Sequence, residues 1–143
     1  ESVNWYFQTL DRMAGAAQLE QFFRHIGYGN CQLGNNLENL WYGSGVKISA
    51  MEQVEILREL CSNGFGADPE NIVAVKEAIA LNEGGFYGKT GTGRLEDANI
   101  AGWFVGFVES AENTRFIAVY LNSPEGADGA AAYEIACHIL EKI

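Results

Sequence analysis

The residues most able to do chemistry in this 143-residue chain are a lysine and a threonine set between glycines. They lie in the segment 87–93, Tyr-Gly-Lys-Thr-Gly-Thr-Gly, which is typical of a short strand. Lys89 would present a fixed positive charge to a carboxylate and favour deprotonation of a neighbouring serine. The Thr90 hydroxyl would hydrogen-bond the same carboxylate, and Gly91 would permit close approach of a ligand. The N–H of Thr92 would point at an acyl oxygen, where one such donor is typically worth about 3 kcal/mol of barrier.

The same residues permit two simpler interpretations. The first is a phosphate-binding loop, which needs a glycine at position 83 and a helix after Thr90. Position 83 is Glu83, and the residues after Thr90 are polar and interrupted by glycines, so this interpretation is disfavoured. The second is a lysine on an ordinary edge strand, and the tripeptide alone does not separate that role from a chemical one.

Ser2 and Asn4 form a second candidate pair, because a Ser-x-Asn segment stands at the start of the first predicted helix. The Ser2 hydroxyl is a group whose deprotonation a nearby ammonium would favour. The alternative is that Ser2 only caps the helix and Asn4 is an ordinary polar residue of its first turn. The capping and chemical roles of Ser2 can coexist.

The elements that must position these residues follow from hydrophobic spacing, which predicts an α+β fold. Antiparallel strands are expected at about 86–92, 102–110 and 115–122, and a long Gly- and Asn-rich loop at 28–48. A capping box at Ser49 and Glu52 starts the third helix, and the pair Asp68-Pro69 starts the fourth. A sheet of three strands is narrow, so we expect further strands upstream. Helices are expected at 3–13, 16–26, 69–80 and 129–142, and the helix that the capping box starts is expected to end at Asn63-Gly64.

The composition excludes some classes of binding partner for this chain. The net charge of −10 argues against nucleic acid and against anionic membrane surfaces. No apolar run approaches the roughly 20 residues of a transmembrane helix, and no signal peptide is visible. The length suits one domain or part of one. No metal site is expected, because the cysteines are far apart and only two histidines are present, and the odd cysteine count favours buried free thiols. These residues are Cys31, Cys61, Cys137, His25 and His138.

Taken together, the motifs resemble the penicillin-recognising serine enzymes and receptors. The Lys-Thr-Gly strand is followed by Gly-Trp-Phe-Val-Gly at 102–106, and Ser2-x-Asn4 matches the second motif of this family. Tyr-Gly-Asn at 28–30 and the segment 40–53 are similar to class D β-lactamases and to extracellular sensor domains of the BlaR/MecR type. The matches run from Ser2 to about Leu140, nearly the whole chain.

This resemblance implies a five-stranded antiparallel sheet with helices on both sides and a serine nucleophile in a Ser-x-x-Lys motif. The one such spacing here, Ser44 to Lys47, lies in the long loop, which is the wrong place. Residues 1–143 are therefore expected to be the C-terminal part of a single β-lactamase/transpeptidase-like domain. The isolated chain should not become acylated, because its nucleophile would lie upstream.

The resemblance also separates a receptor from a hydrolase. In class D enzymes the lysine of the absent motif is carboxylated by CO₂, and a valine usually lines its pocket where this chain has Asn4. An amide at that position can hydrogen-bond the lysine amine and disfavour the carbamate, so that the acyl state is long-lived. Trp41 matches an indole beside that lysine, or it simply fills the core. No arginine occurs at 126–132, so carboxylate recognition is expected to rest on Lys89, Thr90 and Thr92.

The implied function is β-lactam sensing by the extracellular domain of a membrane-anchored signal transducer of a Gram-positive bacterium. The alternatives are a secreted class D β-lactamase, a peptidoglycan transpeptidase and a non-catalytic binding module. The expected partners are a β-lactam or a peptidoglycan stem peptide and the remainder of the same domain. Lys89, Ser2 and Asn4 would be catalytic, and Thr90, Gly91, Thr92 and Trp41 would bind substrate. No cofactor is expected on this chain.

Overall fold

The computed structural model describes residues 3–34, 37, 40, 45–82 and 84–142. Its residues divide into two compact units, Glu1–Glu52 and Gln53–Ile143. None of the helices in the described ranges has the length and apolar character needed to cross a bilayer.

Two helices make up the regular part of the first unit. They are α1 (Asn4–Ala14) and α2 (Ala16–Ile26), and they are separated by Gly15, whose φ of +79° suits glycine. Gly27 ends α2 in the left-handed conformation. Three buried side chains from α2 and the following loop form the core of this unit: Phe23, Leu33 and Leu40.

The long loop after α2 is held together by the side chain of Asn30. Its Nδ2 donates to the carbonyl oxygen of Gly45 (2.7 Å), and its Oδ1 accepts from the backbone N–H of Lys47 (3.0 Å) and of Gln32 (3.3 Å). At Gly29 a Cβ would overlap the Lys47 carbonyl oxygen, so only glycine allows this approach. The Tyr-Gly-Asn segment therefore joins two stretches of chain about 15 residues apart.

The third and fourth helices begin as the sequence predicts. At the start of α3 (Ala50–Cys61), the N–H of Ser49 donates to Glu52 Oε2 (2.7 Å) and the N–H of Glu52 donates to Ser49 Oγ (3.2 Å). At the start of α4 (Pro69–Ala78), Asp68 accepts from the N–H of Glu70 (3.0 Å). Both sets of bonds satisfy backbone donors that have no partner inside the helix.

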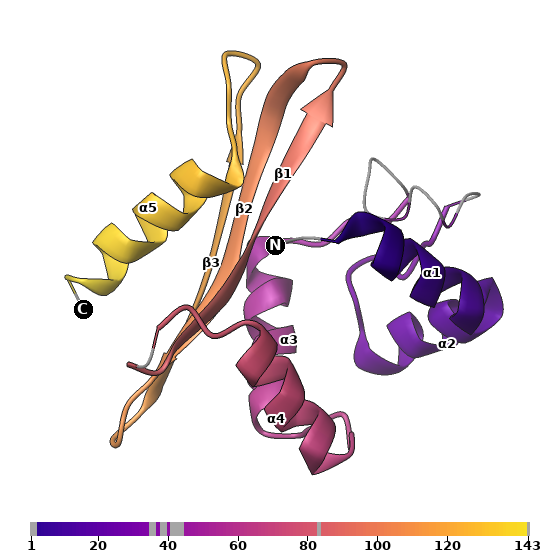
Figure 1. Cartoon of the computed structure of the whole chain (residues 1–143), viewed down its shortest axis with the longest axis horizontal. Coiled ribbons are helices and arrows are strands. Elements are labelled where there is room, and N and C mark those ends of the chain that lie inside the picture. The colour runs from indigo at the N-terminus through magenta and orange to yellow at the C-terminus, as the bar shows by residue number, and fades with distance from the viewer. Residues whose placement is uncertain (1–2, 35–36, 38–39, 41–44, 83, 143) are drawn as a thin grey trace. The chain divides into compact units, whose positions relative to one another are not determined.

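The second unit contains an antiparallel sheet with strand order β1-β2-β3 (Figure 1). The strands are β1 (Phe86–Leu95), β2 (Ala98–Glu109) and β3 (Thr114–Asn122). One face is covered by α5 (Gly129–Leu140), which buries Ala132 and Ala136 against Phe104 and Ile117. On the other face the Lys76 ammonium of α4 lies 5.6 Å from the centroid of the buried Phe107 ring. Helices therefore contact both sides of the sheet, as predicted.

The hairpin between β1 and β2 is longer than predicted. The expected strands stopped at residue 92 and began again at 102, whereas pairing continues to Leu95 and Ala98. Residues 93–101 lack the alternation of apolar side chains that marks a strand, and the register shifts between Gly93 and Arg94. A polar bond closes the tip instead, from Arg94 Nε to Asn99 Oδ1 (2.9 Å).

Gly102 sets how closely α5 can approach the sheet, and it generates a stability prediction. A Cβ at this buried position would overlap the carbonyl oxygen of Asp128, the residue that caps α5. We expect Gly102→Ala to lower the free energy of unfolding of the complete protein by roughly 1–3 kcal/mol, measured by urea denaturation. The matched control is Gly91→Ala, whose Cβ would meet only the Trp103 Cβ at 3.7 Å. Equal stability of the two variants would contradict this account.

The half-buried ion pair between Lys76 Nζ and Glu109 Oε1 (2.5 Å) generates a pH-dependent prediction. Burial lowers the pKa of Lys76, but the hydrogen bond and charge of Glu109 outweigh it, so the pKa lies above the usual lysine value. A raised lysine pKa contributes stability that is present at neutral pH and is lost as the pH rises through that pKa. We expect Lys76→Met to lower the free energy of unfolding by roughly 1–2 kcal/mol near neutral pH.

The difference between wild type and Lys76→Met should shrink as the pH rises past about 10.4, the ordinary lysine pKa. Urea denaturation curves at a series of pH values measure this difference in the free energy of unfolding. Arg58→Met is the control, because Arg58 pairs with Glu55 on an exposed helix surface and should contribute little. A difference that stayed constant into the alkaline range would show that packing, not charge, is responsible.

Candidate functional site

The outer edge of β1 changes character at Gly88. Before that point it is bonded to the end of α4 and the turn that follows: Gly88 N donates to Ile79 O (2.8 Å), and Leu81 N donates to Phe86 O (2.9 Å). Beyond Gly88, β1 pairs only with β2 among the described strands, because it is the first strand in the sheet order. The side chains from Lys89 to Thr92 are exposed there. The Lys-Thr-Gly segment is thus an open strand edge.

Backbone groups of this edge point outward in a fixed pattern. The N–H of Gly88 points away from β2, toward Ile79, and residues two apart along a strand repeat that direction. The N–H groups of Thr90 and Thr92 therefore also point to the open edge. Lys89 Nζ reaches the same edge, where it donates to the carbonyl oxygen of Thr90 (2.6 Å). A positive charge and outward-pointing backbone donors thus share one edge.

The side chains of the segment lie on two faces of the sheet. Thr90 pairs with Phe104 and Thr92 with Gly102, which puts both threonines on the face covered by α5. Thr92 Oγ1 accepts a hydrogen bond from the backbone N–H of Gly129 (3.0 Å) at the start of α5. Lys89 and Gly91 alternate to the opposite face, where Gly91 pairs with Trp103. A ligand along the edge would have the ammonium on one side and the hydroxyls on the other.

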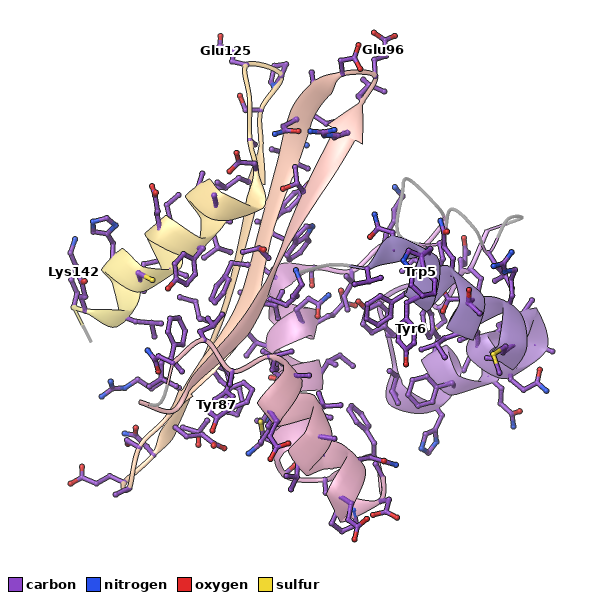
Figure 2. The ribbon with its side chains drawn as sticks, in the orientation of Figure 1. Trp5, Tyr6, Tyr87, Glu96, Glu125 and Lys142 are labelled. Atoms are coloured by element: carbon purple, nitrogen blue, oxygen red, sulfur yellow. The ribbon has the colours of Figure 1, made fainter. Side chains whose placement is uncertain are left out.

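Aromatic residues line the strand on the face of Lys89. Tyr87 stacks on Phe107 with ring centroids 4.8 Å apart, and Trp103 packs against Tyr120 at 4.6 Å. In Figure 2, Tyr87 and Glu96 label the two ends of this region of β1 and its hairpin. One ring pair thus lies before the Lys-Thr-Gly segment, and the other lies opposite Gly91 at its end.

The remaining predicted site residues do not lie on β1. Asn4 is exposed as the first residue of α1, in the first unit. Val3 occupies the N-cap position without a side-chain hydrogen bond, so the helix begins after Ser2. Ser2 and Trp41 lie outside the described residues, and their roles stay predictions. Lys89, Thr90, Gly91 and Thr92 are brought together by one strand.

Sequence reasoning missed two residues beside this strand. Asp128 caps α5 by accepting from the N–H of Ala131 (2.9 Å), and Gly129 donates to Thr92. The Asp-Gly pair before an apolar run was a visible capping signal, because Asp is favoured at N-caps. The contact with Thr92 had no sequence signal, since 37 residues separate the partners.

The cysteines are free and half-buried, which confirms free thiols but at lower burial than expected. Burial raises the pKa of Cys61, although the nearby Lys76 charge opposes the shift. The hydrogen bond with Cys137, together with burial, raises the pKa of Tyr133 on α5. In the described ranges, no three His, Cys, Asp or Glu side chains gather as a metal site. None of these groups lies on the open edge of β1.

Comparison with known proteins identifies a matching family and similar relatives. The family model "Penicillin binding protein transpeptidase domain" matches residues 1–83 and 73–141. The regulatory protein BlaR1 of Bacillus licheniformis is 40% identical over 144 residues, covering 99% of this chain and 24% of that protein. The methicillin resistance mecR1 protein of Staphylococcus aureus is 35% identical over 145 residues, covering 99% of this chain and 25% of that protein.

Solved structures of two kinds of protein, a penicillin receptor and a class D β-lactamase, are similar to this chain. The C-terminal domain of the Bacillus licheniformis BlaR penicillin-receptor superposes with a TM-score of 0.88 at 40% identity, covering 97% of this chain and 57% of that one. A class D β-lactamase from Bacillus subtilis superposes with a TM-score of 0.86 at 30% identity, covering 97% of this chain and 57% of that one. This chain therefore spans about a quarter of the curated relatives and 57% of the solved domains.

Proposed function

Because this chain belongs to the family of penicillin-binding protein transpeptidase domains, we propose that it is the C-terminal part of a β-lactam sensor domain of the BlaR/MecR type. The sensor forms a covalent acyl bond with the antibiotic and releases it slowly. The similarity to a solved penicillin receptor at 40% identity, with a TM-score of 0.88, supports this function over others of the family.

The open edge of β1 is the observation that carries the proposal. A β-lactam has an acyl carbonyl and a carboxylate on one small rigid frame. The outward N–H of Thr92 suits the developing oxyanion of the carbonyl. The ammonium of Lys89 and the hydroxyl of Thr90 suit the carboxylate, and Gly91 between them leaves the backbone accessible. One strand thus offers the groups that a cyclic acyl donor requires.

The chemistry needs a serine outside this chain. Its Oγ forms a bond to the lactam carbonyl carbon, the ring C–N bond breaks, and the serine proton is transferred to the ring nitrogen. Ser2 is proposed to pass that proton, with Lys89 favouring its deprotonation. Asn4 is proposed to hydrogen-bond the lysine of the Ser-x-x-Lys motif and disfavour its carboxylation by CO₂. Trp41 is proposed to lie beside that lysine.

The acyl-serine persists because the general base for its hydrolysis is missing. A persistent acyl state suits a receptor that reports the antibiotic, and it would make a poor hydrolase. The whole protein is proposed to stand on the outer side of a Gram-positive cell membrane, with a β-lactam or a peptidoglycan stem peptide as its ligand.

A class D β-lactamase is the second candidate. The structural similarity to a class D enzyme at 30% identity, with a TM-score of 0.86, favours it over a transpeptidase. In that case the Lys89 edge would bind the same antibiotic, but a carboxylated lysine would activate water and release the product. The two candidates therefore differ in the lifetime of the acyl state, not in ligand recognition.

Measuring the lifetime of the acyl state in the complete protein tests the proposal. We expect a fluorescent penicillin to label it covalently and the label to persist for hours. Release within seconds would favour the β-lactamase, and no labelling would exclude both candidates. Asn4→Val should accelerate release by about tenfold or more, because it removes the amide that opposes carboxylation of the general base. Asn71→Val, the same change on the exposed surface of α4, is the matched control.

Gly91→Ala tests whether the backbone of the edge must be accessible. The substituted Cβ meets only Trp103 at 3.7 Å, so we expect the fold to keep its stability. The methyl group would stand where the ligand approaches, and we expect labelling by penicillin to slow by about tenfold, measured as a second-order rate constant. Labelling at the wild-type rate by a stable variant would mean that the ligand does not lie against this residue.

A further inference from the structure

The hydroxyl of Thr92 is held by a bond that the proposed binding role does not require. Its oxygen accepts the backbone N–H of Gly129 at 3.0 Å. A hydroxyl has one proton to donate as well as lone pairs that accept. None of the described residues accepts the proton of this hydroxyl, and its side chain is exposed. The bond from Gly129 therefore fixes the oxygen and leaves the proton available.

The approach of α5 to β1 depends on the residue at position 129. A Cβ there would lie 2.9 Å from the Gly91 carbonyl oxygen, 2.9 Å from Thr90 Cβ and 3.1 Å from Gly91 N. These contacts include backbone atoms, which cannot move aside without shifting the strand. Gly129 is also buried, so no solvent-filled space remains for a side chain. A larger residue would lift the start of α5 away from Thr92.

Two further backbone bonds hold the same end of α5 in place. Ala127 N donates to Asn99 O (3.1 Å), and Ser123 N donates to Ile100 O (3.0 Å), which ties the loop before α5 to β2. The Asp128 carboxylate is turned into the helix, where it accepts from Ala131 N. The one N–H of this end that reaches the Lys-Thr-Gly strand in the described structure is that of Gly129.

We infer that Gly129 is a positioning residue for ligand carboxylates: its backbone N–H orients the Thr92 hydroxyl so that the hydroxyl proton is donated to the carboxylate at the β1 edge. Each accepted bond polarises the hydroxyl and strengthens the bond that it donates. This arrangement supplies a neutral donor where residues 126–132 offer no arginine. The inference rests on the proposed β-lactam function and extends it to a residue on another element.

The test compares benzylpenicillin with its methyl ester, which lacks the negative charge. Acylation of the complete protein by each compound is followed by intact-protein mass spectrometry, and the ratio of the two rates measures the preference for a free carboxylate. Thr92→Val should reduce that ratio by about tenfold, since it removes a hydrogen bond to a charged group. Thr92→Ser, which keeps the hydroxyl, should retain most of the ratio. Gly129→Ala should reduce it as Thr92→Val does.

Each outcome decides a different point. A ratio unchanged by Thr92→Val, or acid and ester slowed equally, overturns the inference while leaving β-lactam binding intact. A folded Gly129→Ala protein with the wild-type ratio overturns the role of Gly129. Failure of the wild-type protein to react with either compound overturns the proposed function, and the inference with it.

If Gly129→Ala does not fold, hydrogen exchange tests the inference instead. Hydrogen exchange at the Gly129 amide should be faster in Thr92→Val than in Thr92→Ser, because only the serine variant keeps an acceptor for that N–H. Equal exchange in the two variants would show that the bond between these residues does not exist in solution, and would overturn the inference.

Discussion

The contact on which the second unit depends is the approach of the start of α5 to the first two strands. Two glycines make this approach possible because neither has a Cβ. Gly102 on β2 lies against the Asp128 carbonyl, and Gly129 on α5 lies against the backbone of Gly91. Burial of apolar area between α5 and the sheet supplies the stabilising free energy. The glycines decide where along the strands that burial can occur, and they place the helix start opposite Thr90 and Thr92.

The centre of the sheet is buried by apolar packing, whereas the open edge of β1 must stay exposed to bind a ligand. Phe104 and Phe107 on β2 are fully buried on the two faces and fix the sheet between helices. The side chains from Lys89 to Thr92 are exposed, and among the described strands their backbone has a partner on one side, β2. A ligand that pairs with such an edge gains hydrogen bonds without disturbing the core. The side chains that fill the centre of the sheet thus come from β2, whereas the proposed recognition groups come from the neighbouring strand β1.

The sequence was sufficient to predict the elements, including the strand that contains Lys89 to Thr92. Apolar spacing and capping pairs such as Ser49 and Glu52 are local signals, and the helices begin within a residue of the expected positions. The longer hairpin was missed because Arg94 and Asn99 stabilise it by a polar bond, which leaves no hydrophobic period. The bond between Thr92 and Gly129 could not be predicted, since it depends on how tertiary packing brings distant residues together.

The single amide of Asn30 has a consequence for how much change the long loop after α2 can tolerate. By bridging Gln32, Gly45 and Lys47, it closes the intervening residues into a ring whose two ends are fixed to each other. Changes of length or sequence inside the ring need not alter the direction in which the chain leaves toward α3. Closing a longer ring costs only slowly increasing entropy. The long loop of this chain can therefore tolerate changes between its two ends while Asn30 keeps those ends together.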